Sequence, residues 1–107
     1  MASITFAGRP ALELREYKAY RIGSDITAKD LDFCIVDKSV AKFHATLTRA
    51  GPRLYLVNES RVGNVFVNGM GIGSVTLISI RNVINGVVRL RFGNVEAELR
   101  VSPNMTG

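Results

Sequence analysis

Apolar residues recur at every second position over much of the sequence, and this period limits what the chain can fold into. In the last such segment, residues 95–101, Val95, Ala97 and Leu99 alternate with glutamate and arginine. This alternation is typical of a strand with one buried and one solvated face, because a helix would need apolar residues three or four positions apart. The sequence therefore predicts an all-β protein.

Turn signals separate the alternating segments. Asn68-Gly69 and Asn85-Gly86 can adopt the positive φ angles of a tight hairpin turn, and residues 93–94 form a similar pair. Strands are expected at residues 3–6, 11–14, 19–22, 32–36, 43–48, 54–57 and 95–101, with surface loops at 24–31 and 37–41. Within 43–48, Phe43 is expected to share the buried side. About ten short strands joined largely by hairpins predict an antiparallel β-sandwich.

Length and composition fit one small domain. A chain of 107 residues with 47% hydrophobic and 21% charged residues can bury a core. We expect a single domain at residues 1–102 and a polar tail or the start of a linker at 103–107. No apolar run reaches the roughly 18 residues of a membrane helix, and no secretory signal is evident, so we expect a soluble intracellular domain.

The residue inventory argues against an enzyme or a metal protein. The chain has one histidine and one cysteine, and it lacks G-x-S-x-G and H-E-x-x-H motifs and a glycine-rich phosphate loop leading into a helix. Cys34 lies in an apolar run and is expected to be a buried structural thiol. We therefore expect no catalytic residues, no metal and no cofactor.

The charge distribution leaves the kind of partner open. Residues 38–107 hold nine basic and three acidic side chains, and the whole chain carries a net charge of +5. Such an excess could favour an anionic partner. The basic residues are scattered singly, however, and no aromatic-rich stacking surface accompanies them. A solvated basic face is the preferred interpretation, and direct nucleic-acid contact is the less favoured one.

Short blocks along the chain resemble the forkhead-associated (FHA) family. They are YRIG at residues 20–23, KFHA at 42–45, FVNG at 66–69 and LRFG at 90–93, in the order of the family pattern. The resemblance spans roughly residues 18–101. It implies a β-sandwich of about eleven strands of the FHA/SMAD-like type, whose loops at one end read phosphothreonine in a partner protein.

The phosphate-contacting positions of that pattern are changed in this chain. The resemblance implies a guanidinium and hydroxyl donors for the phosphate, and an asparagine for the peptide backbone. Ser24 stands where the arginine is expected, Ala41 replaces a serine, and Lys42 replaces its arginine neighbour. Aligned from the hairpin, the third block contributes Asn64 and Val65, and valine removes a second hydroxyl. These degenerate positions predict loss of ordinary phosphothreonine binding.

The other positions in the blocks fall into two groups. Residues that could still contact an anion are Lys42, Arg61 and Ser60, whereas those expected to form the framework are Gly23, His44, Asn68 and Gly69. In particular, His44 is expected to hydrogen-bond across the loops as a scaffold histidine.

These inferences favour a non-catalytic protein-interaction module that acts by homodimerisation or by a phosphate-independent contact. Residues 75–80 and 87–88 carry apolar side chains on both phases of a strand, which fits either an exposed patch or an inner strand covered on both sides. The chain also resembles the amino-terminal FHA domains of mediators of the DNA-damage checkpoint, some of which self-associate. That likeness implies a nuclear role at chromatin. The alternative is phosphothreonine-peptide binding through a rewired pocket containing Lys42, Arg61 and Asn64.

Overall fold

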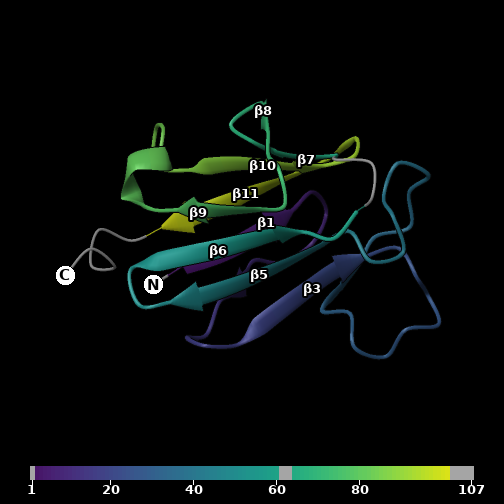
Figure 1. The fold of residues 1–107 in the computed structure, drawn as a ribbon. Coiled ribbons are helices and arrows are strands. Elements are labelled where there is room, and N and C mark those ends of the chain that lie inside the picture. The colour runs from purple at the N-terminus through teal and green to yellow at the C-terminus, as the bar shows by residue number, and fades with distance from the viewer. Residues whose placement is uncertain (1, 61–63, 102–107) are drawn as a thin grey trace.

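The computed structural model describes residues 2–60 and 64–101, which form two stacked β-sheets (Figure 1). The elements are β1 (Ala2–Phe6), β2 (Leu12–Glu13), β3 (Ala19–Gly23), β4 (Phe33–Cys34), β5 (Ala45–Ala50), β6 (Arg53–Asn58), β7 (Val65–Val67), β8 (Met70–Gly71), β9 (Val75–Ile78), the 3₁₀-helix η1 (Ile80–Asn82), β10 (Val88–Phe92) and β11 (Val95–Val101). The predicted all-β sandwich of about eleven strands is confirmed.

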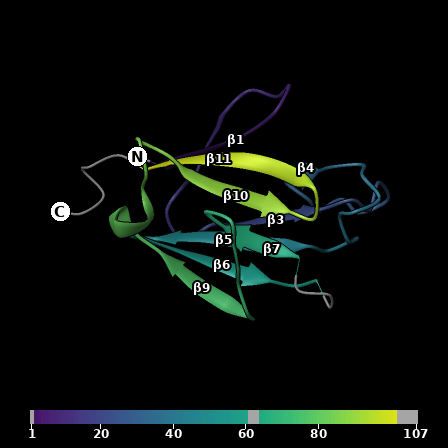
Figure 2. The same cartoon turned by 90° about the horizontal axis from the view of Figure 1, so that it is seen from above.

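One sheet has six strands in the order β2-β1-β11-β10-β7-β8, and the other has five in the order β4-β3-β5-β6-β9. All pairings between these strands are antiparallel except that of β3 with β4, which is parallel. Figure 2 shows the layer of β1, β11 and β10 lying over the layer of β5, β6 and β9. The register confirms the period-two pattern, because Leu90 lies opposite buried Ala97 while Arg91 lies opposite Glu96 on the outer face.

The core lies between the two sheets and joins them through aromatic and aliphatic contacts. Phe6 of β1 lies 4.8 Å from Phe33 of β4 and 6.0 Å from Phe92 of β10, measured between ring centroids. Leu47 and Leu99 come from opposite sheets and are both fully buried. Burial of such side chains is the main stabilising contribution to a small sandwich.

The predicted turn chemistry is present at each hairpin. Asn68 and Gly69 have φ angles of 50° and 84°, and Asn85 and Gly86 have φ angles of 52° and 83°. Two successive positive values are what a tight hairpin turn between twisted strands requires. Gly93 also has a positive φ, 61°, in the turn between β10 and β11.

The prediction for residues 43–48 was wrong at its beginning. β5 begins at Ala45, so Phe43 is exposed and His44 is fully buried, the reverse of the expected phase. The backbone before Ala45 belongs to the preceding loop, and there the His44 N–H donates to the Ile22 carbonyl at 2.8 Å. Strand periodicity does not extend across that junction.

Other expected strands are shorter than predicted. The segment 32–36 contributes only β4, and the segment 75–80 ends as a strand at Ile78 before η1. Cys34 is partly exposed rather than buried, because β4 is a two-residue strand at the sheet edge. Val87 and Val88 are buried, so they do not belong to an exposed patch.

No helix in the described part of the chain is both long and apolar enough to span a membrane. The polar tail predicted at 103–107 lies outside the described residues.

Candidate functional site

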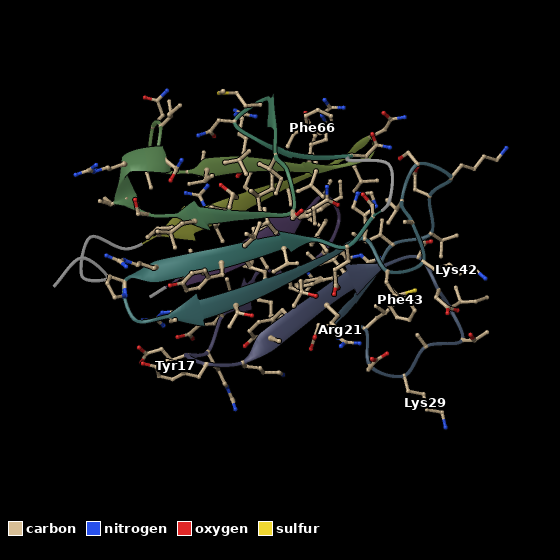
Figure 3. The ribbon with its side chains drawn as sticks, viewed as in Figure 1. Tyr17, Arg21, Lys29, Lys42, Phe43 and Phe66 are labelled. Carbon is tan, nitrogen blue, oxygen red and sulfur yellow. The ribbon has the colours of Figure 1, made fainter. Side chains whose placement is uncertain are left out.

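The loops that carry the sequence blocks gather at one end of the sandwich. They are the β3–β4 loop, the β4–β5 loop, the segment between β6 and β7 and the β10–β11 turn. Figure 3 places Lys42 and Phe43 at this end, with Lys29 further out on the β3–β4 loop. Arg61, predicted as a residual anion contact, lies outside the described residues.

A glycine allows the β4–β5 loop to lie directly against the end of β3. A Cβ atom on Gly23 would lie only 2.0 Å from the Lys42 carbonyl oxygen, so only glycine fits there. The neighbouring backbone seals this contact, because the Ser24 N–H donates to the Ala41 carbonyl at 3.0 Å and the Ile35 N–H to the Gly23 carbonyl at 2.7 Å.

A second glycine supports the other side of the same loop. A Cβ on Gly93 would lie 2.1 Å from the Ser39 carbonyl oxygen, and its φ of 61° also favours glycine. The Ser39 hydroxyl accepts a hydrogen bond from the Asn94 N–H at 2.8 Å and donates to the Asp37 carboxylate at 2.6 Å. The β4–β5 loop is therefore clamped between β3 and the β10–β11 turn.

His44 links three of these segments from a fully buried position. Its Nδ1 accepts the Ala41 N–H at 2.9 Å, which leaves Nε2 to donate to the Asn64 carbonyl at 2.8 Å. The ring also packs edge-on against Phe92, with the centroids 5.9 Å apart. Both ring nitrogens are used within the protein, as expected for a scaffold residue.

The polar groups beside His44 are also turned inward. Ser60 is almost fully buried, and its hydroxyl donates to the Asn58 side chain at 2.7 Å. The same hydroxyl accepts the Asn64 N–H at 3.4 Å. The Asn64 carbonyl accepts the Gly93 N–H at 2.8 Å besides the bond from His44. The hydrogen bonds formed by Ser60 and by the Asn64 backbone thus hold the loop together.

The two positions expected to bind phosphate offer no free donor side chain. The Ser24 hydroxyl donates to the Val40 carbonyl at 2.8 Å, and the methyl side chain of Ala41 has no polar atom. Lys42 is exposed and is the cation nearest to them in sequence. An anion at this end would meet an ammonium group but no guanidinium at position 24.

The prediction that position 65 is a phosphate-site position was wrong. Val65 begins β7, pairs with Phe92 and is fully buried in the core between the sheets. A hydroxyl at position 65 would point into the core and could not reach a ligand at the loop surface. The difference arises because the alternation of β7 already applies at its first residue.

Acidic side chains lower the positive potential of the two long loops. Residues 24–44 hold three lysines and four aspartates, although the whole chain is basic. Hydrogen bonds from Thr27 lower the pKa of the Asp25 carboxyl, and those from Ser39 lower the pKa of Asp37, so both carboxylates are charged at neutral pH. These negative charges oppose the binding of a phosphate.

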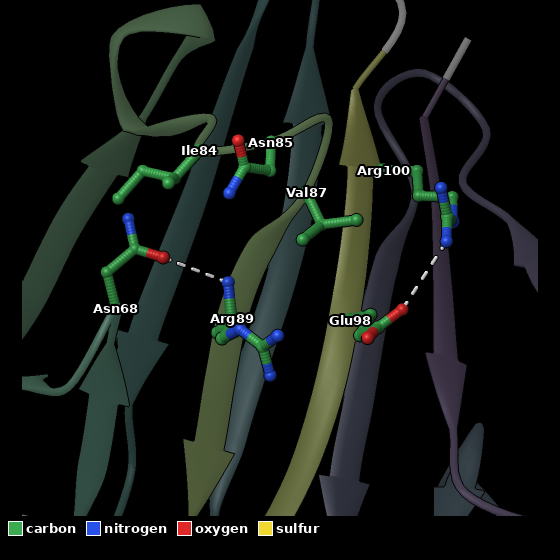
Figure 4. Close-up of a pocket in the computed structure, with 7 residues that line it drawn as sticks. All are labelled: Asn68, Ile84, Asn85, Val87, Arg89, Glu98 and Arg100. Carbon is green, nitrogen blue, oxygen red and sulfur yellow. Dashed lines mark hydrogen bonds and ion pairs between the residues drawn. The ribbon is translucent and has the colours of Figure 1, made fainter.

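Asn68, predicted as framework, forms a clamp on the other sheet. Its side-chain carbonyl accepts the Arg89 N–H at 3.0 Å, and its amide donates to the Asn82 carbonyl at 2.7 Å. Next to it lies a cavity of about 370 Å³, whose lining includes Ile84, Arg89 and Glu98 (Figure 4). Glu98 pairs there with Arg100 at 3.5 Å, so opposite charges largely offset each other.

Among residues 2–60 and 64–101, no group of three or more His, Cys, Asp or Glu side chains could hold a metal ion. Sequence reasoning missed Ser39 and Asn58, whose side chains hold the loops in place. The spacing Asp37-x-Ser39 was a usable signal, since an aspartate that accepts from a residue two positions later is typical of a turn. Asn58 gave no such signal.

Comparison with known proteins places this geometry in a family. The family model described as "Mutator 2 Fork head associated domain" matches residues 3–101. No match was found among curated proteins.

Solved structures of FHA domains are similar to this fold. The FHA domain of the CT664 protein from Chlamydia trachomatis has a TM-score of 0.76 at 20% identity, and the match covers 94% of this chain and 96% of that chain. An FHA domain from a study of phosphothreonine-dependent interactions has a TM-score of 0.73 at 19% identity and coverage of 95% and 97%. The FHA/BRCT-repeat region of S. pombe Nbs1 has a TM-score of 0.76 at 14% identity, covering 95% of this chain and 36% of that one.

FHA domains are non-catalytic modules that bind protein partners, commonly phosphothreonine peptides, which agrees with the absence of catalytic motifs in the sequence. With a family model that matches nearly its whole length, this chain belongs to the Mutator 2 Fork head associated domain family.

Proposed function

We propose that this FHA domain has lost ordinary phosphothreonine recognition and acts by phosphate-independent protein contact, above all by homodimerisation. The observation that carries the first part is the Ser24 hydroxyl, which stands at the arginine position and donates to the Val40 carbonyl. Ala41 adds no donor, and Asp25 and Asp37 place negative charge in the same loops.

The energetic argument compares lost contacts with the affinity of a typical complex. A hydrogen bond to a charged group contributes about 1.5–3 kcal/mol. Losing the guanidinium and a serine hydroxyl therefore removes several kcal/mol from a micromolar complex worth about 8 kcal/mol in total. Lys42 replaces only part of this, because a single ammonium cannot form the paired hydrogen bonds of a guanidinium.

The resemblance to mediators of the DNA-damage checkpoint supports a place for this module. We propose that it acts in the nucleus, in the chromatin response to DNA damage, with protein partners rather than with nucleic acid. The acidic residues in the loops support the preference for protein, because they oppose contact with a phosphate backbone.

Isothermal titration calorimetry with a degenerate phosphothreonine peptide library tests the loss of recognition. We expect no saturable binding by the natural chain, and a gain of phosphate-dependent binding in the double variant Ser24→Arg with Ala41→Ser. Val65→Thr is the matched control, since its buried hydroxyl should lower stability without adding affinity. Low-micromolar, phosphate-dependent binding by the natural chain would instead establish the rewired pocket.

Exposed apolar side chains on the five-stranded sheet support homodimerisation. Val75, Leu77 and Tyr55 lie on its outer face and are 58%, 45% and 39% exposed. Sedimentation equilibrium of the purified domain should give a mass that approaches twice 11.7 kDa as the concentration rises. A monomer mass up to several hundred micromolar would remove the homodimer from the proposal.

A further inference from the structure

Strand β9 leaves an unpaired backbone edge at the end of the five-stranded sheet. It pairs only with β6, with Val57 opposite Val75 and Tyr55 opposite Leu77. The Asn58 N–H donates to the Ser74 carbonyl at 2.8 Å, so residues 74, 76 and 78 direct their backbone groups toward β6. Val75 and Leu77 therefore direct their N–H and C=O groups away from β6, toward the open edge.

This edge has none of the features that commonly block pairing with another strand. The sequence from Phe66 to Ile80 holds no charged residue and no proline. Edge strands are usually very short, or protected by lysine, proline or a bulge. The other three edge strands, β2, β4 and β8, have two residues each, whereas β9 has four. β9 is therefore the edge best suited to accept a further strand.

The outer face along β9 is apolar as well as open. Val75 and Leu77 are exposed there, and Val57 and Tyr55 of β6 lie directly beside them on the same face. The inner face is covered, since Ile78 is fully buried. An added strand would gain backbone hydrogen bonds from the edge and apolar contacts from this face, which is the pattern of β-strand addition.

We infer that the occupant of this edge is β9 of a second copy of the chain, paired antiparallel about a two-fold axis at Thr76. This inference rests on the proposed homodimer and names its interface. In this register Val75 lies opposite Leu77 of the second copy, and Leu77 opposite its Val75, so the outward backbone groups form four hydrogen bonds. The two five-stranded sheets become one continuous sheet of ten strands.

A second copy fits better than an unrelated strand because the register is self-complementary. A two-fold interface requires each patch to match itself. Here the uncharged segment meets an uncharged segment, and the row Tyr55, Leu77 continues into Val75 and Val57 of the second copy. No like charges face each other anywhere along this row.

Charge-swapped variants test the interface directly. The acidic variant Val75→Glu/Leu77→Glu and the basic variant Val75→Lys/Leu77→Lys should each sediment as a monomer at concentrations where the natural chain is a dimer. A mixture of the two should dimerise again, because each glutamate then lies opposite a lysine. Ile84→Glu is the matched control, since Ile84 is also 58% exposed but lies beside β10, and it should stay dimeric.

A cysteine cross-link provides a readout that does not depend on weakening the dimer. In the Cys34→Ser background, Thr76→Cys places two thiols across the axis in a non-hydrogen-bonded pair, with Cα atoms about 4.5 Å apart, which suits a disulfide. Mild oxidation should give a covalent dimer on a non-reducing gel. Thr5→Cys, half-buried on the other sheet, should not cross-link.

The outcomes separate the interface from the homodimer itself. A natural chain that stays monomeric ends the proposed homodimer, and with it this inference. A dimeric natural chain whose charged variants remain dimeric, or whose Thr76→Cys form does not cross-link, would overturn the β9 interface and leave the homodimer standing. Restored dimerisation in the mixture, together with the cross-link, would establish the interface.

Discussion

Two glycines with almost no space around them decide the shape of the loop end. Gly23 and Gly93 approach the carbonyls of Lys42 and Ser39 from opposite sides of the β4–β5 loop. Neither contact involves a ligand, and both keep the loop backbone against the sandwich. The persistence of this frame explains why a chain can match the FHA pattern closely in shape while Ser24 and Ala41 lack the phosphate-binding side chains.

Gly23→Ala should destabilise the domain by about 2 kcal/mol or more, because its Cβ would lie 2.0 Å from a backbone carbonyl that cannot move without displacing the loop. Gly73→Ala is the control. It has no atom within 4 Å of the added Cβ and should change the free energy of unfolding by less than about 0.5 kcal/mol. Urea denaturation of both variants measures the difference, and equal midpoints would contradict the close approach.

At the scale of elements, side chains in turns hold separate strands together. Asn68 lies in the β7–β8 turn, yet its amide group bonds to η1 on one side and to β10 on the other. Asn85 has the same backbone conformation and is also followed by glycine. The structure records no side-chain hydrogen bond for Asn85, which makes the two asparagines a matched pair.

Asn68→Gly should lower the free energy of unfolding by about 1–3 kcal/mol, because two hydrogen bonds each contribute about 0.5–1.5 kcal/mol while glycine retains the positive φ. Asn85→Gly keeps the turn and loses no such bond, so its effect should stay below about 0.5 kcal/mol. Thermal unfolding of the two variants gives the comparison. A loss for Asn85→Gly as large as that for Asn68→Gly would show that only turn conformation matters.

At the scale of the whole molecule, one core joins the two sheets. Buried side chains from β1, β10 and β11 pack against those from β3, β5 and β6 as a single cluster. The contact between Phe6 and Phe33 crosses from one sheet to the other. Such a core predicts that the sheets unfold together, as small single domains usually do.

Leu47→Ala in one sheet and Leu99→Ala in the other should each cost about 2–5 kcal/mol, because both side chains are fully buried. Each variant should still unfold in one transition by calorimetry. Leu12→Ala in β2, where the side chain is 36% exposed, should cost markedly less. Two separate transitions in either core variant would argue against a shared core.

The sequence by itself determined the elements whose information is local. Alternation in residues 95–101 predicted β11, and Asn-Gly pairs predicted two tight turns, because side-chain direction and backbone angle are set within a few residues. The same local patterns, with the resemblance to FHA domains, were enough for the sandwich and its approximate strand number. They failed at Phe43 and His44, where a loop replaces the expected strand.

Only the tertiary structure decided which side chains of the candidate site are available. It placed Val65 in the core, used the Ser24 hydroxyl on a backbone carbonyl, and brought His44 between Ala41 and Asn64. It also made β9 an edge strand. Each of these depends on contacts between residues far apart in the chain, and such contacts leave no periodic trace in the sequence, since they follow from how the two sheets and their loops pack.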